Sequence, residues 1–144
     1  MAIELEVEVA AGRATCWAEL EKLEDHVAWM ADAVAIHFHG AQQRGTGTAF
    51  SCATKIGPFR TTDEMVVTDW IEGEAMAVEH RGLFSGRGRF TLIDTNPGRT
   101  TVRWREEIRF PWWALGRVGA LLAKPVLRAV WRGNLKRLKA RIEA

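Results

Sequence analysis

Two ionisable residues, Glu106 and His80, interrupt otherwise apolar faces of segments that alternate like β-strands. Within 99–110, the apolar residues that share the parity of Glu106 are Val102, Trp104, Ile108 and Phe110. Within 74–81, the apolar residues that share the parity of His80 are Met76 and Val78. Because successive side chains of a strand point to opposite faces, Glu106 and His80 are both predicted to face the interior. A carboxylate and an imidazole in an apolar site are suited to general acid/base catalysis.

The sequence leaves the role of this pair open. Buried charges are usually paired whatever they do, so Glu106 and His80 could simply satisfy each other, or Glu106 could lie in water near a cavity mouth. The pair could instead orient a carbonyl or hydroxyl group of a ligand, because apolar pockets use few polar anchors. It could also transfer a proton. No spacing in the sequence selects a reaction, so enzymatic activity stays undecided.

The remaining candidate motifs predict neither a metal nor a cofactor. His37 and His39 share one face of a strand, but that face is solvated if Ile36 and Phe38 are core, and zinc needs a third ligand. The stretch "GTGTAF" lacks the third glycine and the following helix of a dinucleotide-binding loop. Cys52 faces inward without an adjacent base, which favours a small core residue over a nucleophile.

Hydrophobic periodicity predicts the elements that must position the pair. Residues 3–9 alternate as a half-buried strand, and residues 12–33 change to helical spacing with a break near 23–25 that gives two short helices. Six further strands are predicted at 34–39, 47–56, 59–70, 74–81, 84–94 and 99–110. Short turn-rich connections make these strands an antiparallel meander. A long helix follows at 112–142, kinked or divided at Pro125.

This order indicates an α+β helix-grip fold, in which a curved seven-stranded antiparallel sheet wraps around a long C-terminal helix. The chain resembles the SRPBCC superfamily, which includes START-type lipid carriers and pollen-allergen-like proteins, and especially its bacterial polyketide cyclase/dehydrase-like branch. The segments that carry the resemblance are "CWAELEKLEDHVAWM", "GTGTAF", "TKIGPFRTTDEMVVTDWIEGE", "HRGLFSGRGRFTL" and "WREEIRFPWW". It covers nearly the whole chain, residues 1–144 as a single domain. It specifies a cavity better than a reaction.

The resemblance implies an apolar cavity between the sheet and the long helix. It also implies a hydrophobic ligand, such as a lipid, polyketide, aromatic compound or terpenoid, with a possible cyclase or dehydratase role. A non-enzymatic carrier is the alternative. Strand parity and helix periodicity then predict the lining, which is Phe50, Cys52, Met65, Met76, Val78, Phe90, Leu92, Trp104, Ile108, Trp112, Leu115, Leu122 and Val126. The inward face of 59–70 is ambiguous, since Met65 and Val67 favour Asp63, whereas Val66 and Trp70 favour Glu64.

Composition bounds the class of protein. The chain has 144 residues, 47% of them hydrophobic, and no apolar run long enough to span a membrane. Its first residues alternate acidic and aliphatic side chains, unlike a secretory signal, and its two cysteines do not form a disulfide framework. These features predict a cytoplasmic protein.

Charge and tryptophan content leave several partners open. Residues 112–144 carry eight basic residues against one acidic residue, a net charge of +7, whereas the remainder carries −5. A solvated helix face is the favoured interpretation, and nucleic acid is not predicted as a partner. Trp112 and Trp113 follow Pro111, where they could open the helix, pack under the sheet or form a lip over the cavity. Residues 110–128 could instead contact a membrane surface. The protein is expected to be a monomer or a homodimer.

Overall fold

The computed structural model of the protein describes residues 1–111, 113 and 116–144. Strands and helices follow in the order β1 (Ala2–Val9), α1 (Arg13–Leu20), the 3-10 turn η1 (Leu23–Asp25), α2 (His26–Trp29), β2 (Ala33–Phe38), β3 (Ala49–Ile56), β4 (Phe59–Ile71), β5 (Ala75–Arg81), β6 (Ser85–Asn96), β7 (Arg99–Arg109) and α3 (Gly116–Glu143). The break expected near residues 23–25 is the 3-10 turn that separates the two short helices.

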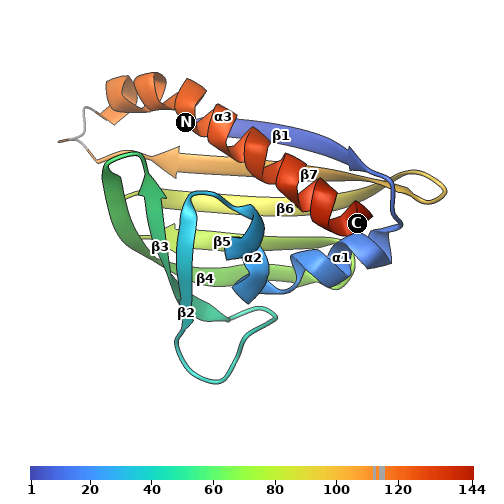
Figure 1. The fold of residues 1–144 in the computed structure, drawn as a ribbon. Helices are drawn as coiled ribbons and strands as arrows, with labels where there is room; N and C mark the ends of the chain where they lie inside the picture. Colours follow the sequence, from blue (N-terminus) through green and yellow to red (C-terminus); the bar gives the residue numbers. More distant parts are fainter. Residues whose placement is uncertain (112, 114–115) are drawn as a thin grey trace.

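The seven strands form one antiparallel sheet in the order β1-β7-β6-β5-β4-β3-β2. Strands β2 to β7 are a meander, as the short connections predicted, and β1 pairs with β7 at the far edge. The sheet curls, and α3 lies across its concave face with α1 and α2 beside its C-terminal half (Figure 1). The predicted α+β helix-grip fold is therefore confirmed.

A β-bulge in β4 resolves the ambiguous strand. Val67 pairs with Val78 and Trp70 with Met76, so two residues of β4 oppose Ala77 alone. Since an extra residue reverses the alternation, both Val67 and Trp70 reach the concave side. Asp63 is buried with Val67, whereas Glu64 is exposed. Met65, Val67 and Trp70 therefore indicated the concave face correctly, whereas Val66, which precedes the bulge and shares the face of Glu64, did not.

Glycines shape the backbone of two strands. The strand expected at 47–56 begins at Ala49, since Gly45 and Gly47 have φ of 84° and 92° in the preceding loop. Gly86 does lie within β6, where a Cβ would meet the carbonyl oxygen of Glu107 at 1.8 Å. Glycine at this position allows the backbones of β6 and β7 to approach each other closely.

Helix α3 begins later than predicted and buries only one of its two apolar stripes. It starts at Gly116, whose φ of 47° separates the helix from Trp113. Its buried stripe includes Leu127, Trp131, Leu135 and Leu138, whereas Val118, Leu122 and Val126 of the second stripe are exposed. Pro125 lies inside the helix, which bends part-way along its length (Figure 1). No described helix is long and apolar enough to cross a membrane.

A polar cluster attaches α3 to the segment between α2 and β2. The side chain of Asn134, fully buried, donates from Nδ2 to Asp32 Oδ1 at 2.7 Å and accepts at Oδ1 from the backbone N–H of Ala31 at 2.9 Å. Trp131 Nε1 donates to the other oxygen of Asp32 at 3.1 Å. These bonds fix the position of the helix over the sheet.

A candidate ligand-binding cavity

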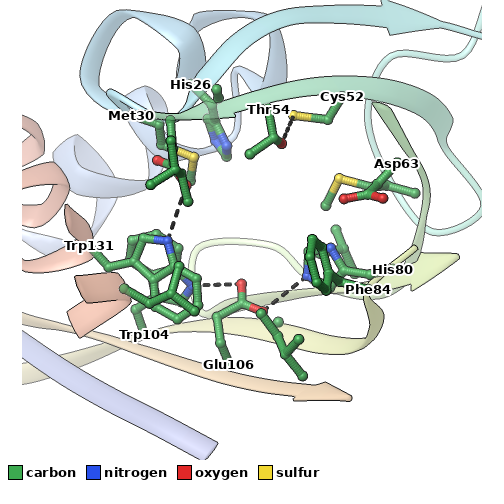
Figure 2. A pocket seen from close by; sticks show the side chains of 18 of the residues that line it. His26, Met30, Cys52, Thr54, Asp63, His80, Phe84, Trp104, Glu106 and Trp131 are labelled. Carbon is green, nitrogen blue, oxygen red and sulfur yellow. Dashed lines mark hydrogen bonds and ion pairs between the residues drawn. The ribbon is translucent and has the colours of Figure 1, made fainter. Parts of the chain in front are cut away.

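A cavity of about 600 Å³ lies between the concave face of the sheet and α3. Its walls come from the short helices, from strands β2 to β7 and from α3, and they are predominantly apolar. This volume falls within the usual range for small-molecule sites. Figure 2 shows the polar exceptions, which point into the cavity from several different elements.

Aromatic side chains form two groups around the cavity. Phe90 stacks on Trp104 with ring centroids 4.9 Å apart, and Trp131 of α3 lies 5.4 Å from Trp104. Phe84 contacts Phe110 at 5.0 Å, and it lies on the opposite side of the cavity from the two tryptophans (Figure 2). These rings offer flat apolar surfaces to a ligand.

Glu106 lies on the cavity wall and hydrogen-bonds to Trp104 on one side and to His80 on the other. Its Oε1 accepts from Trp104 Nε1 at 2.9 Å, and its Oε2 is 3.0 Å from His80 Nε2. The exposed fraction of the side chain is 8% for Glu106 and 17% for His80. The two residues singled out in the sequence therefore form a direct pair on the cavity wall (Figure 2).

A glycine makes room for this carboxylate. Gly88 faces Glu106 across β6 and β7, and a Cβ at Gly88 would lie 2.3 Å from Glu106 Oε1. A side chain at this position would therefore displace the carboxylate from the site where Trp104 and His80 hold it.

The surroundings of His80 favour its cationic form. Burial alone lowers the pKa of His80, but the hydrogen bond to Glu106 and the charges of Glu106 and Asp63 outweigh it, so the pKa is raised above its ordinary value. Because the carboxylate accepts, His80 Nε2 carries the hydrogen. The Nδ1 atom is then the one that can bond to another group.

Two carboxylates and one imidazole also line the cavity, those of Asp32, Asp63 and His26. Asp63 is 7% exposed, and its Oδ1 has no hydrogen-bond partner among the described residues. Burial raises the pKa of Asp63, although the nearby His80 opposes that effect. His26 is 6% exposed and its Nε2 is 2.7 Å from the carbonyl oxygen of Leu20. Burial lowers the pKa of His26 to about 4, which keeps the ring neutral.

Comparison with known proteins places the chain in a family. Residues 1–143 match the model of the family described as "Polyketide cyclase / dehydrase and lipid transport". The chain belongs to this family. The superfamily resemblance noted in the sequence is thereby confirmed. No curated protein matches the chain.

Solved structures share the fold of this polyketide cyclase/dehydrase family member at low sequence identity. The Zhui aromatase/cyclase from Streptomyces sp. R1128 has a TM-score of 0.79 and 13% identity, with 99% of this chain and 93% of the other covered. A START superfamily protein from Mycobacterium smegmatis has a TM-score of 0.74 and 16% identity, with 99% and 97% covered. Norcoclaurine synthase from Thalictrum flavum, in complex with dopamine and hydroxybenzaldehyde, has a TM-score of 0.72 and 15% identity, with 99% and 86% covered.

Most residues expected to line the cavity of this family member do so in the structure. Those found on its wall are Phe50, Cys52, Met65, Met76, Val78, Phe90, Trp104, Ile108, Leu122 and Val126. Leu92 is buried in the core and is not one of the described lining residues, because it lies farther along β6, opposite Val102. Trp112 and Leu115 lie outside the described residues. Trp113, which the prediction did not assign, lines the cavity while 56% of it stays exposed.

Sequence analysis missed His26 and did not choose Asp63. His26 belongs to the lining set with Leu23 and Met30, at spacings of three and four, and that helical stripe could have revealed it. Asp63 could not be chosen over Glu64 from the sequence, because the bulge in β4 reverses the alternation within that strand.

The other candidates do not form a catalytic or metal centre. Within the part of the chain that the structure describes, no three His, Cys, Asp or Glu residues are grouped as metal ligands would be. His39 Nε2 lies 2.7 Å from Glu64 and 2.8 Å from Ser51 on the exposed face. Cys52 Sγ is 3.9 Å from Thr54 Oγ1, and burial raises the pKa of its thiol to about 11, which disfavours a nucleophilic thiolate.

Proposed function

We propose that this protein binds a hydrophobic small molecule in the cavity and uses His80, positioned by Glu106, as a polar contact for the ligand. The observation that carries the proposal is the row Trp104–Glu106–His80 on a predominantly apolar wall. The family, whose description includes both cyclisation and lipid transport, supports a ligand such as a polyketide, an aromatic compound or a lipid.

The hydrogen bonds indicate different roles for Glu106 and His80. Both oxygens of Glu106 already have partners, so this carboxylate positions and charges the imidazole instead of contacting the ligand. His80 offers Nδ1, which as an imidazolium donates to a ligand carbonyl and can protonate it. A cyclase or dehydratase reaction would use this proton transfer. A carrier would use the same bond for orientation alone.

Fluorescence titration with N-phenyl-1-naphthylamine, an uncharged apolar probe, tests occupancy of the cavity. The wild-type protein should bind it saturably with increased emission. Ala123→Trp places a large ring in the cavity from α3 and should abolish binding. Ala129→Trp adds the same ring at an exposed position of that helix and is the matched control.

Equal binding by the Ala123→Trp variant would contradict the proposed site, and absence of binding by the wild type would contradict the proposed function. Mass spectrometry of ligands released from the purified, denatured protein identifies the native compound. Incubation of that compound with wild type and Glu106→Gln then separates catalysis from carriage. Turnover that is lost in the variant supports an enzyme, whereas unchanged compound supports a carrier.

A second candidate function is docking on an anionic membrane through the first half of α3. Val118, Leu121, Leu122 and Val126 are between 52% and 72% exposed, and Trp113 nearby is 56% exposed. The same stretch, 116–128, holds Arg117, Lys124 and Arg128 and no acidic residue. Exposed apolar side chains beside basic ones suit the surface of a bilayer with anionic lipids. Leu122 and Val126 also line the cavity. Docking through this stretch would therefore bring the part of the cavity wall that they form to the bilayer surface.

Vesicle flotation tests this second function. The wild type should float with phosphatidylglycerol vesicles at low salt, and Leu121→Glu should reduce the bound fraction severalfold. Val34→Glu places the same charge at an exposed apolar residue of β2 and should float like the wild type. Failure of the wild type to float would contradict docking on an anionic membrane.

A further inference from the structure

Acidic side chains outnumber basic ones among the ionisable residues that line the cavity. Its described lining residues include the carboxylates Asp32, Asp63 and Glu106 and the imidazoles His26 and His80, but neither lysine nor arginine. The basic residues of α3 lie outside this set. The cavity is therefore acidic inside although the protein as a whole carries a net charge of +2.

The one cation of this set is already shared by carboxylates. His80 bonds to Glu106 at 3.0 Å and also feels the charge of Asp63. His26 cannot supply a second cation at neutral pH, because burial keeps it neutral. An anionic head group that entered the cavity would lose its hydration without gaining an unshared cationic partner, which is a large energetic cost.

Hydrogen-bond acceptors, in contrast, remain available. Both oxygens of Asp32 and both of Glu106 have donors within the protein. Asp63 is more than nine-tenths buried. Its Oδ1 has no partner in full hydrogen-bond geometry among the described residues, although the backbone N–H of Leu83 and the hydroxyl of Thr61 help to lower the pKa of this carboxyl. His26, whose Nε2–H donates to the Leu20 carbonyl, keeps Nδ1 as an acceptor. A buried acceptor without a donor is unfavourable, so a ligand that brings a donor gains energy here.

We propose that the cavity selects hydrophobic molecules whose polar group is an amine or a hydroxyl, with Asp63 as an acceptor for that group, and rejects those that carry a carboxylate or phosphate. This inference rests on the proposed function and adds a head-group preference to it. Under this preference, free fatty acids and phospholipids are poor ligands, whereas long-chain amines, alcohols and phenols are good ones. An anionic bilayer remains a surface for docking, but its lipids are not the cargo.

Competition with one aliphatic tail and three head groups tests the preference. Dodecylamine, dodecanol and dodecanoate are each titrated, below micelle formation, against the protein loaded with N-phenyl-1-naphthylamine. We expect the amine and the alcohol to displace the probe at concentrations at least tenfold lower than dodecanoate. Asp63→Asn should reduce the advantage of the amine severalfold. Glu64→Gln, which removes the neighbouring carboxylate on the exposed face, should leave it unchanged.

The outcomes separate this inference from the function on which it rests. Displacement by dodecanoate at the same or lower concentration overturns the head-group preference but leaves a hydrophobic cavity that binds the probe. Failure of the probe to bind overturns the proposed function first. An unchanged amine advantage in Asp63→Asn removes Asp63 from the recognition. The wild-type comparison needs no variant, so it stands even if a substitution prevents folding.

Discussion

His26 illustrates how the fold sets the chemistry of a single side chain. Its ring packs against Trp29 and Phe90, with ring centroids 4.9 Å and 6.1 Å away. Its Nε2 bonds to the carbonyl oxygen of Leu20. Burial makes the charged imidazole unfavourable, and the Leu20 carbonyl and the carboxylates Glu19 and Asp25 only partly offset that cost.

This burial predicts a loss of stability in acid. The pKa of His26 is about 4 in the folded protein against 6.5 for the free side chain. The unfolded chain therefore takes up the proton first as pH falls, so the free energy of unfolding should decrease between pH 6.5 and 4, by about 3 kcal/mol in total. Urea unfolding across this range measures the decrease.

The variant His26→Gln, whose amide can still donate to Leu20, isolates this effect. Carboxylates titrate in both proteins, as does His80, whose raised pKa has the opposite consequence. The difference between the two curves therefore reports His26. Parallel curves from pH 6.5 to 4 would show that His26 is protonated equally in the folded and unfolded chains.

Gly88 predicts a second effect at the residue scale. In Gly88→Ala, the new methyl group should push the Glu106 carboxylate away from His80, because a Cβ would lie 2.3 Å from Oε1. The pKa of His80 should then fall, since Glu106 raises it. Loss of the buried hydrogen bonds should cost about 1–3 kcal/mol. NMR titration of the imidazole and urea unfolding measure the two quantities.

Gly12→Ala is the control for this substitution, because a Cβ there has no atom within 4 Å. An unchanged His80 pKa in Gly88→Ala would mean that the carboxylate adjusts without leaving its partner.

Strand parity alone placed Glu106 and His80 on one face, because both lie in regular stretches of β7 and β5. It could not reveal that Trp104 completes the row, since that depends on side-chain rotamers.

At the scale of elements, the position of α3 depends on its polar contacts as much as on its apolar stripe. Asn134 is fully buried and connects to Ala31 and Asp32 through two hydrogen bonds. Nothing in the helical periodicity indicated this, because an asparagine inside an amphipathic pattern resembles a solvated residue. The kink at Pro125 was predictable, since proline lacks the N–H that an unbent helix needs.

Replacement of this asparagine should loosen the helix. Asn134→Ala leaves the Ala31 N–H and an Asp32 oxygen without their partner, and we expect the free energy of unfolding to fall by about 1–3 kcal/mol. Chemical denaturation measures the change. Arg132→Ala, at an exposed position of the same helix, is the control. A cost no larger than in that control would show that the apolar stripe alone holds α3.

At the scale of the whole molecule, the cavity lies between the sheet and α3. A ligand there contacts the sheet and α3 at once, and it is expected to bind only the folded chain. N-phenyl-1-naphthylamine at 100 times its dissociation constant should stabilise the protein by about 2.7 kcal/mol and raise the melting temperature by several degrees. Thermal unfolding monitored by circular dichroism tests this. No shift under saturating probe would mean that the probe binds the unfolded chain as well as the folded one.

The overall fold was predictable because its signals are local and repeated. Alternation gave the strands, turn residues gave the antiparallel order, and one long amphipathic segment gave α3. The form of the cavity was not predictable, because it depends on the volumes of Phe90, Trp104 and Trp131 and on the distance between helix and sheet. For the same reason, the sequence could not show that Leu122 and Val126, which line the cavity as predicted, stay more than half exposed.

The space over Gly88 has a consequence for how such sequences diverge. The glycine and Glu106 are far apart in the chain but occupy one volume, since the acid fills the room that the missing side chain leaves. A mutation at either position alone is unfavourable, so the two should be inherited together. Relatives with a larger residue at the position of Gly88 should have lost the acid, and with it the positioned imidazole. A pairwise count across an alignment would thus sort the family into members with and without this site.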